Sequence, residues 1–172
     1  MFYVRKMKER VVLEPKFLGR RVEDVVRKRL VNEVEGKCTA ESGYVISLIS
    51  IDSLSPAEVD VTTGSATFLA EYSALSLFPQ KGEVVDAVVH EINKMGVFAF
   101  VGPFSIFVSM YQIPGQFTDA GDDSSILPND GGPTIVKGSL LRLRIIGVKI
   151  EPAKIFGIGT INDDYLGTAQ HI

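Results

Sequence analysis

The chain has 172 residues, of which 45% are hydrophobic and 23% are charged, and its net charge at pH 7 is −3. This composition is typical of a soluble folded protein with one large domain or two small ones. Cys38 is the only cysteine, which excludes an internal disulfide and fits a reducing compartment. The negative net charge argues against tight, purely electrostatic binding of nucleic acid.

The sequence predicts neither a secretory signal nor a membrane span. The first four residues run directly into Arg5-Lys6 with no long apolar stretch behind them. The most apolar window, Val97–Val108, is interrupted by Gly102-Pro103, and it is too short to cross a bilayer. We therefore expect an intracellular soluble protein.

Charge is distributed unevenly along the chain. Residues 1–37 contain 11 Lys and Arg against 6 Asp and Glu, whereas residues 38–80 contain 5 acidic residues and no Lys or Arg. A basic first segment suits an acidic partner surface. Pairing of these charges within the first domain is an equally open interpretation.

The first half begins with a strand and a helix. Apolar residues at three- and four-residue spacing predict a helix that begins near Leu18-Gly19 and stops at Gly36, because glycine accepts the left-handed conformation of a helix end. Arg29 and Glu33 lie one turn apart at the edge of the apolar arc, and we expect them to pair. The apolar positions are Leu18, Val22, Val25, Val26 and Leu30.

Two long strands follow. Tyr44–Ile51 is rich in β-branched residues and apolar at both alternating positions, which predicts a central strand covered on both faces. Ala66–Phe78 is a longer strand, and Thr62–Ser65 is a turn at an exposed tip. The expected first domain is α+β, with a helix packed on one face of a small antiparallel sheet.

A proline and a glycine interrupt the strand pattern at Phe78–Gly82, so we expect one domain over residues 1–80 and a second over residues 81–172. Five strands in the second domain predict an all-β Greek-key barrel of the OB-fold type. The predicted strands are Glu83–Ile92, Val97–Val101, Phe104–Ser109, Leu140–Lys149 and Phe156–Ile161.

The long connection Pro114–Thr134 is dense in Gly, Asp, Ser and Pro. Such a composition predicts a mobile, solvent-facing loop. Its acidic residues are Asp119, Asp122, Asp123 and Asp130.

The second half resembles the RNA-binding barrel of ribosomal protein S-one. The pattern of that barrel matches Gly82–Val89 with Ile92, Gly96–Ala99, and the alternating strand after Gly138. Two positions depart from it, because Met95 stands where an aromatic residue is usual, and Ser109 is interpreted as the replacement of a histidine. The resemblance implies binding of single-stranded RNA, and the two departures together with the net negative charge of the domain predict that this binding is weak and sequence-tolerant.

The strand pattern itself predicts an exposed aromatic surface. When Val97, Ala99 and Val101 point into a barrel, the residues between them point outward. Phe98 and Phe100 can then stack on unpaired bases, at about 1–3 kcal/mol per base. Packing of both phenylalanines under a loop or the neighbouring domain is the alternative.

Polar residues supply the rest of the predicted RNA site. Arg142 and Arg144 share one face of the fourth barrel strand, where they could contact phosphates. Ser109 completes the predicted set.

Taken end to end, the sequence resembles the larger stalk subunits of eukaryotic RNA polymerases, best matched to the seventh subunit of polymerase II and related to its archaeal counterpart. The match runs in order through nearly all 172 residues. The segments that carry it are Met1-Phe2, Glu14–Gly19, Glu33–Cys38, Gly43–Val45, Phe78–Asp86, Val101–Pro103 and Asp163–Gly167.

This resemblance implies a non-catalytic, nuclear subunit that supports transcription initiation. Its first domain is the tip domain, which docks on the polymerase core through Gly36 and the turn Thr63-Gly64-Ser65-Ala66. The fourth subunit is the implied heterodimer partner, and nascent RNA near the exit is the implied ligand of the barrel. Gln80 departs from the large apolar residue that is usual at the domain joint.

The residues predict no active site, no cofactor and no metal site. His90 and His171 are the only histidines, and with Cys38 they lack the spacing of a zinc site. Asp163 and Asp164 are adjacent, so in a strand they would face opposite sides. No phosphate-binding glycine loop is present.

Three other interpretations stay open at the level of sequence. One is the corresponding subunit of polymerase I or III, or of a specialised plant-type polymerase. Another is a free single-stranded RNA-binding module of translation or RNA decay. A third is a purely structural stalk whose barrel contacts only protein.

Overall fold

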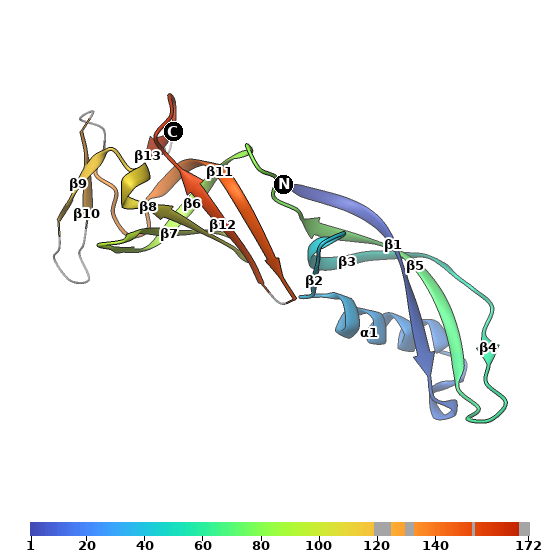
Figure 1. Ribbon diagram of the computed structural model, residues 1–172. Coiled ribbons are helices and arrows are strands. Elements are labelled where there is room, and N and C mark those ends of the chain that lie inside the picture. Colours follow the sequence, from blue (N-terminus) through green and yellow to red (C-terminus); the bar gives the residue numbers. More distant parts are fainter. Residues whose placement is uncertain (119–124, 130–132, 153, 169–172) are drawn as a thin grey trace. The chain divides into compact units, whose positions relative to one another are not determined.

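The computed structural model describes residues 1–118, 125–129, 133–152 and 154–168. The chain forms two compact units (Figure 1), of which the first is Phe2–Phe78 and the second is Pro79–Ile172 together with Met1. Within the described residues, no helix is both long and apolar enough to cross a membrane.

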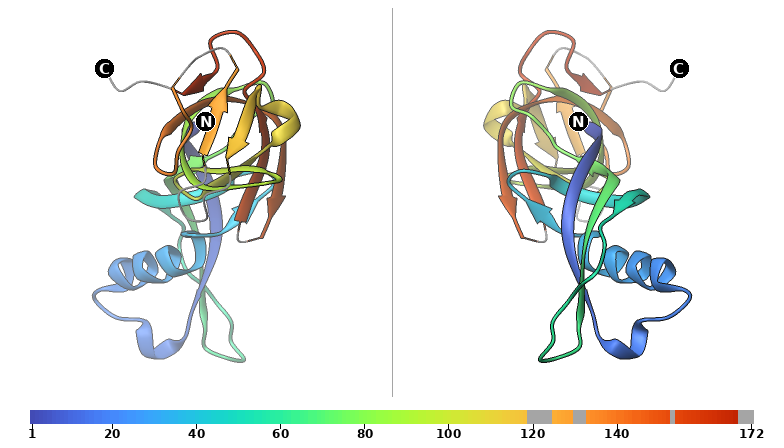
Figure 2. Two further views of the ribbon diagram at one scale, coloured as in Figure 1. Left: turned by 90° about the vertical axis from the view of Figure 1, so that its left-hand side faces the viewer. Right: turned by 90° about the vertical axis from the view of Figure 1, so that its right-hand side faces the viewer.

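The first unit is one helix on an antiparallel sheet, which confirms the predicted α+β fold (Figures 1 and 2). The strand order is β1-β5-β3-β2, and β4 also pairs with β5. The strands β1 and β5 pair over their whole length, from Phe2 opposite Leu77 to Leu13 opposite Ala66. The elements are β1 (Phe2–Leu13), α1 (Val22–Val34), β2 (Cys38–Thr39), β3 (Gly43–Leu54), β4 (Glu58–Val59) and β5 (Ala66–Leu77).

The helix begins at Val22, four residues later than predicted. The preceding residues form a short 3-10 turn, η1 (Pro15–Phe17), in which the Leu18 amide donates to the Pro15 carbonyl. Glu23 and Asp24 occupy the first turn of α1, where negative charge is favourable near the positive end of the helix dipole. Leu18 therefore lies outside the helix and is exposed.

The core of the first unit lies between α1 and the sheet. Val26, Leu30 and Val34 are the buried residues of the helix. Arg29 donates to Glu33 at 3.1 Å on the exposed side, which confirms the predicted pair. The sheet contributes Val11, Leu13, Val45, Leu48, Ala66, Phe68, Ala70, Tyr72 and Ala74 to the same cluster.

The central strand β3 is irregular. Its pairing with β5 shifts three times, after Val45, Leu48 and Ile51. Each bulge inserts one extra residue, so apolar side chains three apart all turn toward the helix. The opposite face is not covered, since Ile49 is 49% exposed. The prediction of a strand buried on both faces was therefore wrong. Apolar residues three apart fall on alternate faces of a regular strand, but the three bulges turn them to the same face.

The second unit is a closed five-stranded barrel, which confirms the predicted OB-type fold (Figure 1). Around the barrel the order is β12-β8-β7-β6-β11, and β11 pairs with β12 to close it. The β8–β12 pair is parallel, whereas the other four pairs are antiparallel. The strands are β6 (Val84–Asn93), β7 (Gly96–Val101), β8 (Phe104–Ser109), β11 (Leu140–Glu151), β12 (Lys154–Thr160) and a short addition, β13 (Gly167–Thr168).

The long connection of the barrel contains a hairpin where the sequence predicted only a mobile loop. A short 3-10 turn, η2 (Met110–Gln112), leads into β9 (Gly115–Thr118), which pairs with β10 (Ser125–Pro128). Ile126 of this hairpin is fully buried and bridges to Ile135, so apolar contact anchors it. The four aspartates predicted for this connection lie outside the described residues.

Candidate nucleic-acid interface

The outer surface of the barrel presents the aromatic side chains that the sequence singled out. On β7, Val97 and Ala99 are fully buried in the barrel. Phe98 and Phe100 alternate with them and are partly exposed. Both rings are therefore on the outer wall, and their binding of RNA stays a prediction.

The neighbouring strand β8 adds a phenylalanine that the sequence analysis missed. Ile106 and Val108 are fully buried, and Phe107 between them is partly exposed. Phe107 lies directly opposite Phe98, with ring centroids 4.9 Å apart and planes tilted by 45°. The alternation that predicted an outward Phe98 also holds for β8, so the signal was present in the sequence.

Strand pairing extends this surface in both directions. Val88 of β6 lies opposite Phe100. On the other side of β8, Phe156 pairs with Ser105, and Ile158 pairs with Phe107. We call the resulting surface the aromatic wall. Its members are Val88, Phe98, Phe100, Phe107, Phe156 and Ile158. None of these carries a charge, but charged residues border the wall, since Glu91 lies opposite Phe98 and Lys149 lies opposite Phe156.

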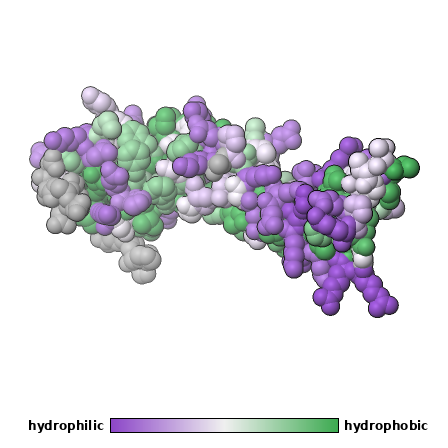
Figure 3. Space-filling model, turned by 90° about the horizontal axis from the view of Figure 1, so that it is seen from below, coloured by the Kyte–Doolittle hydropathy of each residue, from purple (hydrophilic) through white to green (hydrophobic). Residues whose placement is uncertain are grey.

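The wall is accessible as well as apolar. Val88, Phe156 and Ile158 are 49%, 37% and 55% exposed. Figure 3 shows hydrophobic residues reaching the surface of the barrel, whereas hydrophilic residues cover much of the visible face of the first unit. An exposed apolar patch of this kind is typical of a binding surface.

Gly96 allows the Phe107 ring to lie against the backbone. A Cβ atom at position 96 would overlap the Val108 carbonyl oxygen and lie 2.9 Å from the Phe107 ring. The glycine of the predicted barrel motif is therefore required by close approach of a ring and a strand.

The two arginines of the predicted site are both held by carboxylates. Arg142 donates to Asp86 through Nε at 2.7 Å and through Nη2 at 2.9 Å. Arg144 lies 2.9 Å from Asp163. The guanidinium group of Arg142 lowers the pKa of the Asp86 carboxyl below its ordinary value, because its hydrogen bonds favour the ionised form.

Ser109 has a local structural contact. Its hydroxyl oxygen accepts a hydrogen bond from the Tyr111 amide and caps η2. It lies opposite Gly96 at the end of β8. Phe107, two residues earlier, occupies the outward position in the middle of the strand, beside Phe98.

The predicted docking turn lies at the end of the first unit where β1 ends and β5 begins (Figures 1 and 2). Asp60 organises it, because its carboxylate accepts from the Thr62 amide and the Thr63 hydroxyl. Hydrogen bonding to these groups lowers the pKa of Asp60. Gly64 has φ +70, a left-handed conformation that favours glycine because it has no Cβ atom, and Ala66 is fully buried at the start of β5.

Exposed apolar side chains surround this turn. A Cβ atom on Gly64 would lie 3.1 Å from the Pro15 ring, so η1 and the turn are neighbours. We call their combined surface the apolar end. Its exposed members are Phe17, Leu18, Val59 and Val61, and Val61 is 97% exposed.

Gly36 is not part of the apolar end. Its amide donates to the Val45 carbonyl, and Val45 pairs with Ser76 near the far end of β5. Ser65, by contrast, directly precedes the first residue of β5. The structure therefore places the five predicted docking residues at two opposite ends of one sheet.

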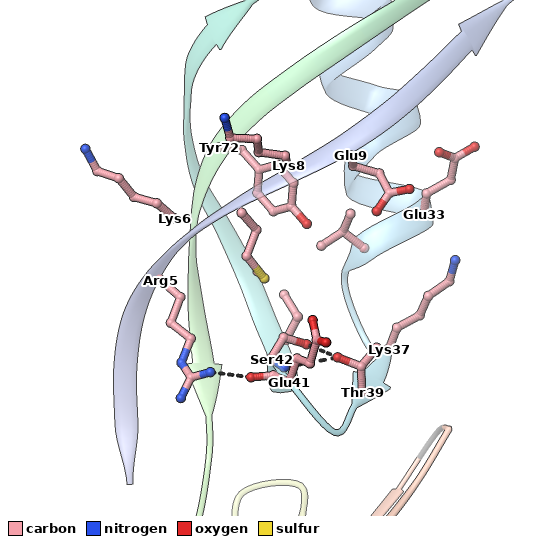
Figure 4. Close-up of a pocket in the computed structure, with 13 residues that line it drawn as sticks. Arg5, Lys6, Lys8, Glu9, Glu33, Lys37, Thr39, Glu41, Ser42 and Tyr72 are labelled. Atoms are coloured by element: carbon pink, nitrogen blue, oxygen red, sulfur yellow. Dashed lines mark hydrogen bonds between the residues drawn. The ribbon is translucent and has the colours of Figure 1, made fainter.

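The first unit also contains a cavity of about 560 Å³ between β1 and the last turn of α1 (Figure 4). Arg5 donates to the Glu41 carbonyl oxygen, and Lys6 and Lys8 point away from the cavity. Tyr72 points its hydroxyl inward, and burial together with Glu9 raises its pKa. Cations and carboxylates are mixed around the cavity, so its charge selects neither an anion nor a cation.

In the part of the chain that the structure describes, no three His, Cys, Asp or Glu side chains lie close enough together to hold a metal ion. His90 packs against Phe100, with ring centroids 5.2 Å apart. His171 lies outside the described residues.

Residues 8–66 match the family model described as the SHS2 domain found in the N terminus of Rpb7p/Rpc25p/MJ0397. The chain is also 38% identical to DNA-directed RNA polymerase II subunit RPB7 of Glycine max, over 97% of this chain and 96% of that protein. The chain belongs to the family of the seventh subunit of RNA polymerase II. This finding confirms the resemblance and identifies the chain as a polymerase subunit of the transcription machinery.

Sequence identity to other related subunits agrees with this assignment. DNA-directed RNA polymerase II subunit 7 of Arabidopsis thaliana is 38% identical over 97% of the chain and 96% of that protein. DNA-directed RNA polymerase V subunit 7 of the same plant is 28% identical over 76% of the chain and 75% of that protein. The similarity to the polymerase II subunits is therefore both higher and more complete.

Proposed function

We propose that this chain is a non-catalytic stalk subunit of RNA polymerase II that binds emerging RNA on the aromatic wall of its barrel. Its first unit docks on the polymerase core, and its heterodimer partner is the fourth subunit. In this role it acts in the nucleus, during initiation and along the RNA exit path. The observation that carries the RNA proposal is the partly exposed, cross-strand pair of Phe98 and Phe107.

Stacking on the aromatic wall supports a weak and sequence-tolerant interaction. Every base has a π face, so a ring pair that is open to solvent accepts any unpaired base, at about 1–3 kcal/mol per stacked base. The wall carries no charge, and the nearby arginines are paired with carboxylates. Weak binding is sufficient in a polymerase subunit, because the enzyme holds its transcript nearby at a high effective concentration.

Alanine substitution of the ring pair tests this proposal. Phe98→Ala with Phe107→Ala should reduce crosslinking of the assembled polymerase to emerging RNA by about fivefold or more, as expected from the loss of one stacked base. Val84→Ala is the matched control, since Val84 is 46% exposed on β6 outside the wall. Unchanged crosslinking in the double variant, with normal assembly, would remove RNA binding from the proposed function.

The apolar end supports docking on the core. Val61 is almost fully exposed, and an apolar side chain gains by transfer from water into a partner surface. The turn Thr63–Ser65 presents short side chains, which allow close approach of another backbone, whereas Ala66 is fully buried. Gly36 lies at the other end of the sheet, so we restrict the proposed docking site to the apolar end.

A charge placed at the apolar end tests the docking proposal. Val61→Asp should reduce the amount of this chain that co-purifies with the polymerase core, because a buried unpaired carboxylate is unfavourable in an interface. The free energy of unfolding of the isolated chain should change by less than about 0.5 kcal/mol, as is usual for a surface position. Val4→Asp is the control, since Val4 is 65% exposed near the opposite end of β1. Equal retention of both variants on the core would contradict docking through Val61.

The proposed heterodimer has a direct test of its own. Co-expression with the fourth subunit should give a complex with one copy of each chain, measured by light scattering after gel filtration. A chain that stays monomeric in the presence of the fourth subunit would contradict the pairing.

A barrel that contacts only protein is the second candidate. The pairing of Arg142 and Arg144 with aspartates favours it, because an apolar wall without free cations also suits a protein partner. The crosslinking experiment distinguishes the two candidates. If the barrel contacts only protein, substitutions in the aromatic wall should weaken assembly with the polymerase, and the wild-type barrel should show no crosslink to RNA.

A further inference from the structure

The two outward arginines of β11 are paired with aspartates from two different segments. Asp86 lies directly opposite Arg142 in the β6–β11 register, and the pair is bidentate at 2.7 and 2.9 Å. Asp163 comes from the segment after β12 and contacts Arg144 at 2.9 Å. The side chains of both pairs are between 38% and 49% exposed, so solvent and ligands can reach them.

A phosphate group would need the same donors. The guanidinium fork binds a carboxylate and a phosphate with the same two parallel N–H groups. While Asp86 accepts both bonds from Arg142, a phosphate oxygen must displace it. The ordinary pKa of an aspartate already lies well below neutral pH, and the hydrogen bonds from Arg142 lower the pKa of Asp86 further, so the competition persists under physiological conditions.

This competition affects single-stranded and duplex RNA differently. A single strand offers base faces to the aromatic wall, and stacking does not require the arginines. Duplex RNA offers phosphates and sugars but no free base faces. Two neutralised arginines therefore weaken contact with a duplex more than contact with a single strand.

We propose that Asp86 and Asp163 determine specificity at this surface, by withholding Arg142 and Arg144 from phosphates so that the barrel selects unpaired RNA over duplex RNA. This inference rests on the proposed binding of RNA by the aromatic wall. The effect is moderate, since exposed ion pairs contribute less than about fivefold to an equilibrium.

Neutral isosteres of the aspartates test the inference in the full-length chain. The probes are an oligouridylate of about 16 nucleotides, the upper end of OB-fold site sizes, and an RNA duplex of equal length. Asp86→Asn with Asp163→Asn should strengthen duplex binding about three- to tenfold and single-strand binding by a smaller factor. The slope of log affinity against log salt for the single strand should steepen by about 0.7 for each arginine that contacts a phosphate.

Two further variants separate release of an arginine from a general change in charge. Asp164→Asn removes the same charge one residue away, and the Asp164 side chain has no ion pair or hydrogen bond among the described residues. It should leave the preference for single strands unchanged. Adding Arg144→Ala to Asp163→Asn should cancel the gain in duplex binding. Each aspartate can be tested singly if the double variant fails to fold.

The outcomes are decisive for both claims. Equal gains in Asp163→Asn and Asp164→Asn, or no gain in either, would overturn the specificity role of Asp163. If the wild-type chain loses single-strand binding on Phe107→Ala while the Asn variants behave as wild type, only this inference fails. If Phe107→Ala has no effect, the proposed RNA function fails. Duplex binding that appears only in the Asn variants still supports the role of the aspartates.

Discussion

The two units expose their apolar side chains in different places, because one sheet is open and the other closes on itself. In the first unit, α1 covers one face of the sheet, and exposed apolar residues lie at the end of the sheet, as Val61 does, and on its uncovered face, as Ile49 does. In the barrel the sheet closes on itself, so its inner face is filled by the core. Exposed apolar residues such as Ile158 therefore lie on the outer surface. This difference is the basis for the proposed docking through the apolar end of the first unit and the proposed RNA contact through the aromatic wall of the barrel.

The face of the first sheet opposite α1 is held by polar contacts rather than by a second layer. Ser73 and Ser50 both donate to Asp52, while Lys8 and Ser53 contact Glu71. The barrel has no equivalent face, since its inward side chains fill its interior. Its core includes Val85, Ala87, Val89, Phe104, Ile106, Leu141, Leu143, Ile145 and Ile155.

Separate cores predict the largest effect. Phe104→Ala should lower the stability of the barrel by about 3–5 kcal/mol, because it removes a fully buried ring. Hydrogen exchange followed by mass spectrometry should show lost protection in the barrel strands and retained protection in β1, α1 and β5.

Leu30→Ala is the reciprocal variant, since Leu30 is a fully buried residue of α1 that packs on the sheet. It should lower the stability of the first unit by about 2–5 kcal/mol and leave exchange in the barrel unchanged. Loss of protection in both units by either variant would mean that the two units unfold together and that their cores are not independent.

Gly96 provides a prediction of intermediate size that connects stability with the wall. Gly96→Ala should destabilise the barrel by about 1–3 kcal/mol, because the added methyl group meets the Val108 carbonyl and the Phe107 ring. Gly147→Ala is the control, since nothing lies within 4 Å of its added Cβ. Urea unfolding curves measure both, and equal stability of the two variants would contradict the close approach at Gly96.

The polar face of the first sheet predicts the smallest effect. Hydrogen bonds from Ser73 and Ser50 hold the pKa of Asp52 below its ordinary value of 3.8. A carboxyl group with a lowered folded pKa stabilises the protein above its unfolded pKa, and this contribution is lost as pH falls through the folded value.

Asp52→Asn should therefore reduce the drop in thermal midpoint of the first unit on acidification from about pH 5 to about pH 2. Glu58→Gln is the control, because the Glu58 side chain has no hydrogen bond or ion pair in the described part of the chain. An acid response of Asp52→Asn equal to that of wild type would show that this hydrogen-bonded carboxylate does not contribute.

Much of the fold could be read from local patterns. Alternation predicted both ends of all five barrel strands to within two residues, and it indicated outward rings at Phe98 and Phe100. The same pattern would have identified Phe107 if it had been applied to β8. The start of α1 was misplaced because Leu18 fits the helical spacing, yet η1 fixes the preceding backbone.

The candidate site was less predictable than the fold. Arg142 and Arg144 share a strand face in the sequence, but their partners Asp86 and Asp163 are 56 and 19 residues away. Gly36 and Gly64 were both predicted to dock on the polymerase core. The register of β5 places them at opposite ends of the sheet, and the sequence alone does not give this register.

The sequence by itself determined the fold class of each half, most of the elements and the outward direction of the β7 aromatics, because these follow from spacing along a single strand or helix. Tertiary structure decided which side chains meet across strands, including the Phe98–Phe107 pair and the two arginine–aspartate pairs. The physical reason is that strand register and barrel closure bring together residues whose separation in the chain carries no local signal.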